Sequence, residues 1–336
     1  MQEKLFITHR QFFGAILACL AVLAAGNLMV QRLTAHTVYR RILADTRASS
    51  SAQIVALGNS LMRSSFVPET FAPPASPHDQ SPAFNLAMGA STPVEQLLLL
   101  RAGLRSFSKP RLLLYGFYDF QLTDPVAFSN TDLIGNHDIL YYEEPDFARR
   151  YFLMNRYESV AFAVTRRLPM LAERGAVWAK VELLRRHLGQ QGMPAEATNQ
   201  FGRAADFTLL EAKNREEFVQ HCAASAHAEL NAPVSEIIRE AQQQGMFVVF
   251  IVMPLPPKHV QSFYDTPVWT TYQKHIQETL AAQNVAYLDA SRWIPDASKF
   301  GDALHLTPQG AGEFSRRLGG LCSNSDNLSA CSSIGK

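Results

Sequence analysis

Ser60, His305 and Asp302 are the residues of this sequence whose types and spacing best fit nucleophilic chemistry. Ser60 follows a short apolar run and the pair Gly58-Asn59, at a point where a buried strand would give way to a helix. A serine hydroxyl is a weak nucleophile unless a neighbouring base takes its proton. The stretch GDALHL supplies the imidazole of His305 and, three residues before it, a carboxylate at Asp302 to orient that ring. These three residues predict acyl chemistry at a serine.

Each part of this pattern also has a simpler explanation. Serine is a preferred helix N-cap, and the tripeptide alone favours capping over catalysis. An Asp-x-x-His pair alone fits an ordinary surface turn. Together the two segments support a Ser-His-Asp arrangement, because they follow the first and the last predicted strands. The carboxyl ends of parallel strands share one edge of a sheet. Capping and reactivity are also compatible, since the positive end of a helix stabilises a developing alkoxide.

Beyond residue 50, short apolar runs alternate with helical segments, the pattern of an α/β domain with a mostly parallel sheet. Strands are expected at 53–58, 83–88, 111–117, 246–256 and 285–290. Helices are expected at 92–107, with Thr92 as N-cap and Pro93 at the first position, at 234–245, at 268–283, and from Pro308 onwards. Three strands before a long insertion and two after it predict one domain that is interrupted once.

The predicted organisation has four parts. Residues 1–30 are the N-terminal hydrophobic segment, 31–50 an amphipathic connector, 51–320 the α/β domain with an insertion at about 120–225, and 321–336 a polar tail. Cys322 and Cys331 bracket the polar stretch SNSDNLSA, where either a short-loop disulfide or two reduced thiols would fit.

The uncharged segment from Phe12 to Val30 has about the length needed to cross a bilayer. We favour an uncleaved signal anchor, that is, a single transmembrane helix, because the apolar run is longer than the usual core of a signal peptide. A cleaved signal peptide and a buried core helix are the alternatives. Basic residues flank the run on both sides, so they do not fix its orientation.

The composition excludes several classes of protein. With 336 residues, 47% of them hydrophobic and 18% charged, the chain is globular rather than disordered. A formal net charge of +1 and the lack of a basic cluster with interleaved aromatics argue against nucleic acid as a partner. No Cys/His grouping has the spacing of metal ligands, and no phosphate-binding glycine-rich loop is present, so we expect neither a metal nor a cofactor.

Five further residues lie close to the predicted strand ends. Gly89 would offer an unhindered backbone N–H as an oxyanion donor, or merely form a turn. Asn59 and Asn85 are candidate substrate contacts, although Asn59 also suits a turn and Asn85 could order a loop or satisfy a buried backbone group. Tyr118 and Asp119, after the third strand, are candidates of the same kind, with a core tyrosine and a capping aspartate as the alternative.

Gly-Asn-Ser after the first strand, a glycine after the second, and Asp-x-x-His before the final helix together resemble the SGNH (GDSL-like) hydrolase superfamily. The resemblance implies a flavodoxin-like three-layer α/β/α sandwich with a mostly parallel five-stranded sheet, and enzymes that cleave or transfer acyl groups. Carried onto this sequence, it makes Ser60 the nucleophile, His305 the base and Asp302 its orienting acid. It also assigns the backbone N–H groups of Ser60 and Gly89 to the oxyanion hole.

Two features depart from the pattern of the superfamily. Asn59 stands where an aspartate is usual, and the third-strand stretch YGFYDF has no asparagine in register to donate to the oxyanion. With the N-terminal helix and the insertion, these departures resemble the membrane-attached subgroup that modifies bacterial surface polymers, which includes polysaccharide O-acetyltransferases and the protein that assists D-alanyl transfer to teichoic acids. That resemblance implies a membrane-bound O-acyltransferase as acyl donor, a polysaccharide acceptor, and a periplasmic domain anchored in the bacterial inner membrane.

Three functional hypotheses follow. The first is an extracytoplasmic acyltransferase that passes an acetyl group through Ser60 to a sugar hydroxyl, and the second is an esterase or deacetylase that uses water instead. The third is a non-catalytic scaffold or binding subunit, in which aromatic residues of the insertion stack on sugar rings. Those aromatic residues are Tyr141, Tyr142, Phe147, Tyr151 and Trp178.

Overall fold

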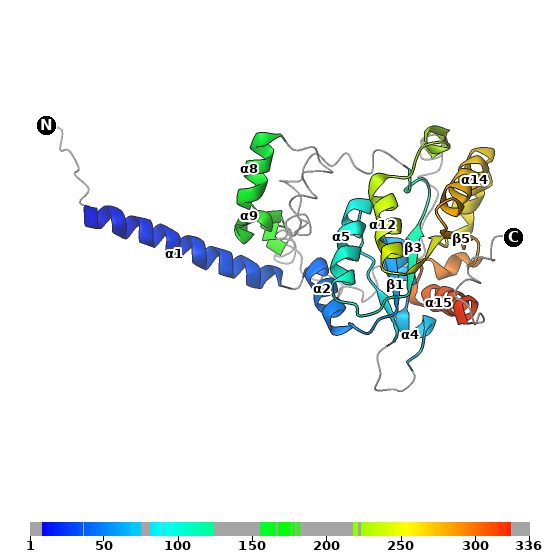
Figure 1. Ribbon diagram of the computed structural model, residues 1–336, viewed down its shortest axis with the longest axis horizontal. Helices are drawn as coiled ribbons and strands as arrows, with labels where there is room; N and C mark the ends of the chain where they lie inside the picture. The colour runs from blue at the N-terminus through cyan, green and yellow to red at the C-terminus, as the bar shows by residue number, and fades with distance from the viewer. Residues whose placement is uncertain are drawn as a thin grey trace, which may run out of the picture. The chain divides into compact units, whose positions relative to one another are not determined.

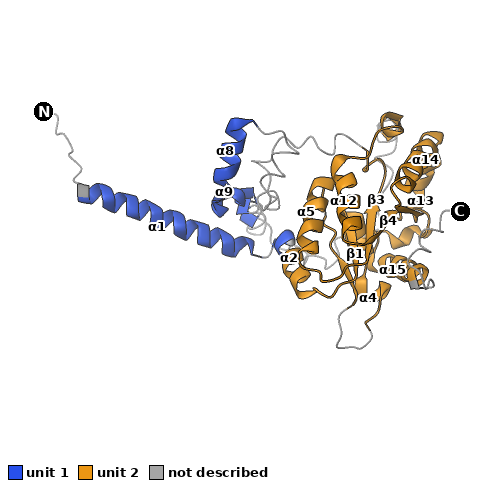
Figure 2. Cartoon of the chain, viewed as in Figure 1, with its two compact units in different colours: residues 1–41, 130–192 blue, residues 42–129, 193–336 orange. Residues whose placement is uncertain are grey.

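In the computed structural model, the chain forms two compact units (Figure 2). Residues 1–41 and 130–192 form the first unit, and residues 42–129 and 193–336 form the second. The structure describes residues 9–35, 37–74, 81–89, 91–123, 155–165, 167–175, 177–178, 180–181, 218–220 and 223–323. Most of the predicted insertion and polar tail, including Cys331, therefore lies outside the described residues.

The second unit is built on a five-stranded, all-parallel sheet in the order β2-β1-β3-β4-β5 (Figure 1). The strands are β1 (Ile54–Gly58), β2 (Ala83–Asn85), β3 (Leu112–Phe117), β4 (Phe247–Val252) and β5 (Ala286–Asp289). All five predicted strands are confirmed. The fourth is shorter than its apolar run, which continues into Pro254 and Pro256, residues without a backbone N–H for the ladder.

The strand order places a topological switch point between β1 and β3. The chain leaves β1 toward one edge of the sheet and leaves β3 toward the other, and ligands of doubly wound sheets bind at the carboxyl ends of such a strand pair. Gly58 pairs with Gly116 across these two strands, so Asn59 and Ser60 emerge level with the residues that end β3. Every residue of β3 is buried, as expected for a parallel strand between two helical layers.

Helices cover both faces of this sheet (Figure 1). On one face α5 (Pro93–Leu104) packs beside α12 (Ala232–Gln243), and on the other α15 (Pro308–Ser323) contacts the short helices α3 (Ser60–Ser65) and α4 (Pro68–Phe71). Helix α14 (Pro267–Ala281) packs against β5. Between β4 and α14 lie α13 (Pro257–His259) and a π-helical turn, η2 (Val260–Tyr264), and the 3-10 turn η3 (Ala297–Lys299) follows β5. The four long helices predicted for this domain are confirmed.

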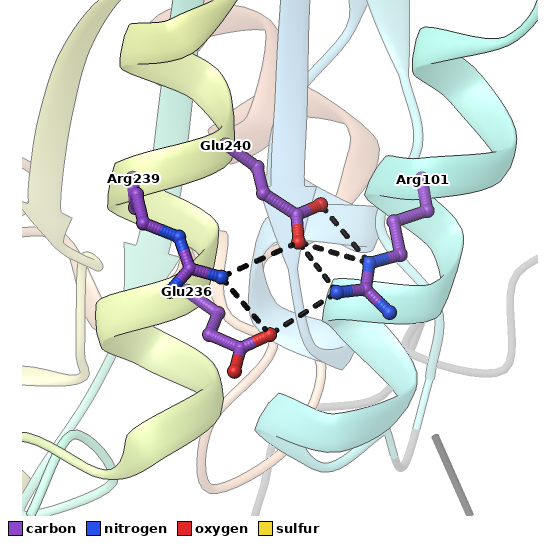
Figure 3. Close-up of polar contacts among 4 residues, drawn as sticks. All are labelled: Arg101, Glu236, Arg239 and Glu240. Carbon is purple, nitrogen blue, oxygen red and sulfur yellow. Dashed lines mark hydrogen bonds and ion pairs between the residues drawn. The ribbon is translucent and has the colours of Figure 1, made fainter. Parts of the chain in front are cut away.

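A charged cluster fastens α5 to α12 (Figure 3). The guanidinium of Arg101 donates to both carboxylate oxygens of Glu240 at 3.0 Å, and its Nη2 lies 3.1 Å from Glu236 Oε2. Arg239, on the solvent side, lies 3.5 Å from the same Glu236 oxygen. The Glu236 side chain is only 6% exposed, so its charge depends on these two arginines.

Replacing Arg101 by leucine should lower the free energy of unfolding of the second unit by about 3 kcal/mol, because two poorly solvated carboxylates would lose their principal partner. Chemical denaturation followed by circular dichroism measures this change. The exposed pair Lys274–Glu278, with N···O 3.9 Å, provides the control, and Lys274→Ala should cost no more than about 0.5 kcal/mol. Equal effects of the two substitutions would contradict the special role of Arg101.

The first unit contains α1 (His9–Thr34), the beginning of α2 (Val38–Ala48), α8 (Arg156–Thr165) and α9 (Pro169–Ala172). Within α1, Arg10–Thr34 is long and apolar enough to cross a membrane, and none of its most apolar window is buried by the protein. The buried-core-helix alternative is therefore wrong, while a signal sequence and an anchor both remain compatible with α1. The predicted connector at 31–50 is mostly helical, since α1 runs to Thr34 and α2 begins at Val38.

Candidate active site

Ser60, His305 and Asp302 form a hydrogen-bonded row in the second unit. Ser60 Oγ lies 2.9 Å from His305 Nε2, and His305 Nδ1 lies 2.8 Å from Asp302 Oδ2 and 3.0 Å from Oδ1. Ser60 and His305 are 245 residues apart in the sequence, so the sheet and its loops bring them together. In this arrangement the imidazole can take the serine proton at Nε2 while the carboxylate holds the proton on Nδ1.

Asn59, not Ser60, caps helix α3. Asn59 has an extended backbone, and its Oδ1 accepts a hydrogen bond from the Leu61 N–H at 2.9 Å. Ser60 is the first residue of the helix, so the alternative in which Ser60 is the N-cap is wrong. Because asparagine is as good a cap as serine, the helix begins without using the Ser60 hydroxyl, which remains available to His305.

A tight turn between β1 and α3 depends on Gly58. Its φ of +150° is one that side-chain-bearing residues rarely adopt, and a Cβ built there would lie 2.5 Å from the Gly116 carbonyl oxygen. Any larger residue would therefore push β1 away from β3 at the point where Ser60 emerges. The glycine of the Gly-Asn-Ser motif is required by backbone geometry, independently of any chemistry.

The loop after β2 lies against the same turn. The Met88 N–H donates to the Gly58 carbonyl at 3.2 Å, and Ser91 Oγ donates to that carbonyl at 3.2 Å and to the Met88 carbonyl at 2.8 Å. A Cβ built on Gly89 would lie 3.9 Å from the Cβ of Ser60. Gly89 is thus next to the serine, as its proposed role as an oxyanion donor requires.

The loop that carries His305 is closed by its own backbone. Phe300 and Leu306 form an isolated antiparallel bridge, and the Gly301 N–H donates to the His305 carbonyl at 2.8 Å. Inside this loop, Asp302 Oδ1 accepts the N–H groups of Leu304 at 2.8 Å and of His305 at 2.7 Å. One carboxylate therefore both shapes the loop and orients the imidazole.

The pKa of Asp302 reflects this double role. Partial burial acts to raise its pKa, but the hydrogen bonds from the Leu304 and His305 N–H groups and the attraction of the imidazole outweigh it, so the pKa falls below its usual value. Asp302 therefore stays ionised at neutral pH and can stabilise an imidazolium at His305.

Asn85, a candidate substrate contact, uses its side chain inside the protein. Its Nδ2 donates to the carbonyls of Phe66 at 2.8 Å and Arg63 at 3.2 Å, and its Oδ1 accepts the Ala87 N–H at 3.1 Å. Two of these groups belong to the end of α3 and one to the loop after β2. Asn85 thus joins the end of α3 to the loop after β2, which agrees with the alternative that its side chain orders a loop.

Asp119, another candidate substrate contact, lies in a second polar cluster beyond the end of β3. Its Oδ1 accepts the Tyr264 hydroxyl at 2.9 Å and lies 3.1 Å from His259 Nε2, while its N–H donates to the Tyr264 oxygen at 2.9 Å. Asp119 has a φ of +49°, uncommon for a residue other than glycine, and these contacts hold it there. Burial first, and then Asp119, raise the pKa of both Tyr118 and Tyr264, so both phenols stay protonated at neutral pH.

Gln121 is the residue near the site that the sequence pattern did not single out. Its Oε1 accepts a hydrogen bond from Asn59 Nδ2 at 3.0 Å, which links the segment after β3 to the turn that carries Ser60. Since Asn59 Oδ1 is occupied by the Leu61 N–H, Asn59 must present its amide nitrogen to Gln121, which in turn must present its oxygen. The Gln121 Nε2 group is therefore not used in the hydrogen bond with Asn59. No spacing rule marks a glutamine in this position.

The other predicted features lie elsewhere. Among the described residues, no group of three or more His, Cys, Asp or Glu side chains could hold a metal ion. Trp178 belongs to the first unit and is 69% exposed. Tyr141, Tyr142, Phe147 and Tyr151, the remaining candidates for stacking on sugars, lie outside the described residues.

Comparisons with known proteins add no family assignment: no protein-family model matches this chain, and no curated protein matches it either. The fold that the structure establishes is an α/β domain on a five-stranded parallel sheet, with one apolar N-terminal helix.

The pKa of Asp302 gives a test by stability. A carboxyl whose pKa is lowered on folding contributes stability above its unfolded pKa of about 3.9, and this contribution is lost as the pH falls through the folded value. Asp302→Asn keeps an oxygen for the Leu304 and His305 N–H groups but carries no charge. The difference in unfolding free energy between the two proteins should therefore shrink below about pH 4. Denaturant titrations in detergent between neutral and acid pH measure it, and a constant difference would contradict the assignment.

Proposed function

We propose that this chain is an extracytoplasmic serine acyltransferase that passes an acyl group, acetyl in the first instance, through Ser60 to hydroxyls of a bacterial cell-surface polysaccharide or exopolysaccharide. The observation that carries the proposal is the row in which Ser60 Oγ lies 2.9 Å from His305 Nε2 and His305 Nδ1 lies 2.8 Å from Asp302. A serine within reach of an oriented imidazole is the arrangement that nucleophilic catalysis needs.

The proposed reaction has two steps. First, Ser60 Oγ attacks the acyl carbonyl while His305 Nε2 takes the hydroxyl proton, and the same proton then passes to the leaving group as its bond to the acyl carbon breaks. Second, His305 takes the proton of a sugar hydroxyl, whose oxygen attacks the acyl-serine. The bond to Ser60 breaks and its oxygen recovers the proton from His305. Each step forms one bond to the acyl carbon and breaks another, and each proton that His305 takes is passed to the group that leaves.

Three donors are proposed for the oxyanion. The Ser60 N–H belongs to the first turn of α3, where helix N–H groups have no carbonyl partner within the helix. The Gly89 N–H lies in the loop next to Ser60. We assign the third donor to Gln121 Nε2, which would replace the side-chain amide that the third strand lacks, because the contact with Asn59 fixes which end of its amide is the donor.

The proposed setting of the reaction rests on α1 and on the resemblance to membrane-attached members of the SGNH superfamily. In this setting α1 anchors the chain in the bacterial inner membrane and the second unit lies in the periplasm. A membrane-bound O-acyltransferase would deliver the acyl group. Transfer rather than hydrolysis is proposed because Asn59 and the lack of a third-strand asparagine depart from the usual hydrolase pattern and, with α1, resemble the membrane-attached subgroup.

The acyl-serine is directly testable. The full chain in detergent, exposed to an activated acetyl ester such as 4-nitrophenyl acetate, should carry an acetyl adduct on the peptide that contains Ser60, detected by mass spectrometry. Ser60→Ala should abolish the adduct, and Ser64→Ala, one turn further along α3, should leave it unchanged.

Adding an oligosaccharide acceptor then separates the two enzyme hypotheses. Faster loss of the adduct together with an acetylated sugar supports transfer, whereas release of acetate alone indicates an esterase. A chain that never becomes acetylated, and a Ser60→Ala variant that still supports polymer modification in cells, would together point to a non-catalytic subunit.

Gln121→Glu isolates the proposed third donor. The glutamate keeps an oxygen for Asn59 Nδ2 but replaces the amide N–H donor by a negative charge, which disfavours an oxyanion, so the rate of Ser60 acetylation should fall by about 100-fold or more with little change in stability. The rate is measured by the release of 4-nitrophenol, and thermal unfolding reports on stability. The matched control is Gln242→Glu on α12, whose amide donates to the Gln283 carbonyl far from Ser60 along the chain. Full activity of Gln121→Glu would remove Gln121 from the oxyanion hole.

A further inference from the structure

An apolar stripe is exposed along α8 in the first unit. Tyr157, Val160 and Val164 follow the i, i+3, i+7 spacing of one helical face, and Tyr157 is 86% and Val160 58% exposed. The opposite face holds Phe162 and Thr165, which are buried. A helix that buries one face normally exposes polar residues on the other, so this exposed apolar face needs a partner.

Apolar side chains are also exposed in the segments that follow α8 along the chain. They are Leu171 on α9 and, further on, Trp178 and Val181. The set includes Tyr157 and Trp178, and tyrosine and tryptophan are the aromatic residues enriched where a protein meets the boundary between lipid tails and headgroups. We refer to these six side chains as the α8–Trp178 surface: Tyr157, Val160, Val164, Leu171, Trp178 and Val181.

Contacts tie this surface to the carboxyl-terminal part of α1. The Met170 N–H donates to Asn27 Oδ1 at 3.1 Å, and the Met170 side chain lies against Gly26. The Lys180 ammonium donates to the Leu33 carbonyl. Asn27 and Leu33 lie near the end of the apolar stretch Arg10–Thr34. A helix that spans a bilayer brings its last turns to the headgroup region, so these contacts set α9 at that depth.

The charge of the first unit points to the chemistry of the partner. From Arg32 onwards, its described residues include seven basic side chains and two acidic ones, and one of the acidic pair, Glu173, forms an ion pair with Arg40. The basic residues are Arg32, Arg40, Arg41, Arg156, Arg167, Arg174 and Lys180. Anionic lipid headgroups attract such an excess by roughly 1 kcal/mol for each basic residue near the surface.

We infer that the α8–Trp178 surface binds the surface of an anionic lipid bilayer, with its apolar side chains entering the boundary between headgroups and tails. The inference rests on the proposed membrane anchoring of α1 and extends it: part of the insertion is a second membrane contact, fixed in depth by the first. The packing of α9 on α1 joins the two membrane contacts in one unit.

Quenching of Trp178 fluorescence by brominated lipids tests the inference. The full chain is reconstituted into phosphatidylcholine–phosphatidylglycerol vesicles whose acyl chains carry bromine close to the headgroups. The chain has three tryptophans, and Trp269 is buried in the second unit, so the Trp178→Phe variant gives the background to subtract. The wild type should lose a clearly larger fraction of its emission than Trp178→Phe. Equal fractional losses would overturn the inference.

Substitutions on α8 then test the surface itself. The double variant Val160→Asp, Val164→Asp should reduce quenching of Trp178, because charged side chains are costly in the apolar boundary. Asn155→Asp is the matched control, because it adds a negative charge just before α8 but keeps the oxygen that accepts the Glu158 N–H. Trp178 in this control should be quenched as strongly as in the wild type. Membrane binding by this surface would be contradicted if the aspartates on α8 left the quenching of Trp178 by brominated lipid unchanged. It would also be contradicted if an added oligosaccharide prevented that quenching.

Two further readouts separate this inference from the proposed function. Ser60→Ala should be quenched like the wild type, since acyl transfer plays no part in the measurement. Extraction with alkaline carbonate reports on α1 alone: a chain that stays in the vesicles while Trp178 is not quenched retains the anchor but overturns the second contact. Release of the wild-type chain would overturn both the anchor and this inference.

Discussion

The hydrogen bond from the Leu61 N–H to Asn59 Oδ1 is the contact on which the candidate site depends. It begins α3 with Asn59 as the cap, so no helix N–H group engages the Ser60 hydroxyl. With Ser60 as the cap, its oxygen would accept a backbone N–H and its side chain would turn toward the helix. With Asn59 as the cap, the serine hydroxyl lies within 2.9 Å of His305 Nε2.

The cap is connected to the rest of the carboxyl edge. Asn59 uses its other polar atom to bind Gln121, which follows β3, and the same segment is held by the contacts of Asp119 with Tyr264 and His259. Residues after β1, β3 and β4 are thereby joined by side chains across the switch point of the sheet. This explains the uncommon backbone of Asp119: the energy of its left-handed conformation is offset by hydrogen bonds, one of them from its own N–H group.

The sequence predicted what depends on local periodicity. All five strands and the principal helices of the second unit follow from apolar runs and from signals such as Pro93 and Pro308, and the pairing of Ser60 with His305 followed from the rule that parallel strands end at one edge. The cap at Asn59 was missed because asparagine and serine have nearly equal propensity there. The partners of Asp119 lie 140 and 145 residues away, and their contact depends on packing that no spacing encodes.

The row itself does not distinguish a sugar hydroxyl from water. In the proposed reaction His305 would deprotonate either, and the proposed backbone donors at Ser60 and Gly89 would stabilise the same oxyanion in both cases. On this proposal, selection of the acceptor must come from groups that bind a sugar and exclude water around the acyl-serine, and not from Ser60, His305 and Asp302. A second membrane contact would contribute in a different way. By restricting the motion of a membrane-anchored unit, it would reduce the entropy lost when the chain meets a donor in the same membrane.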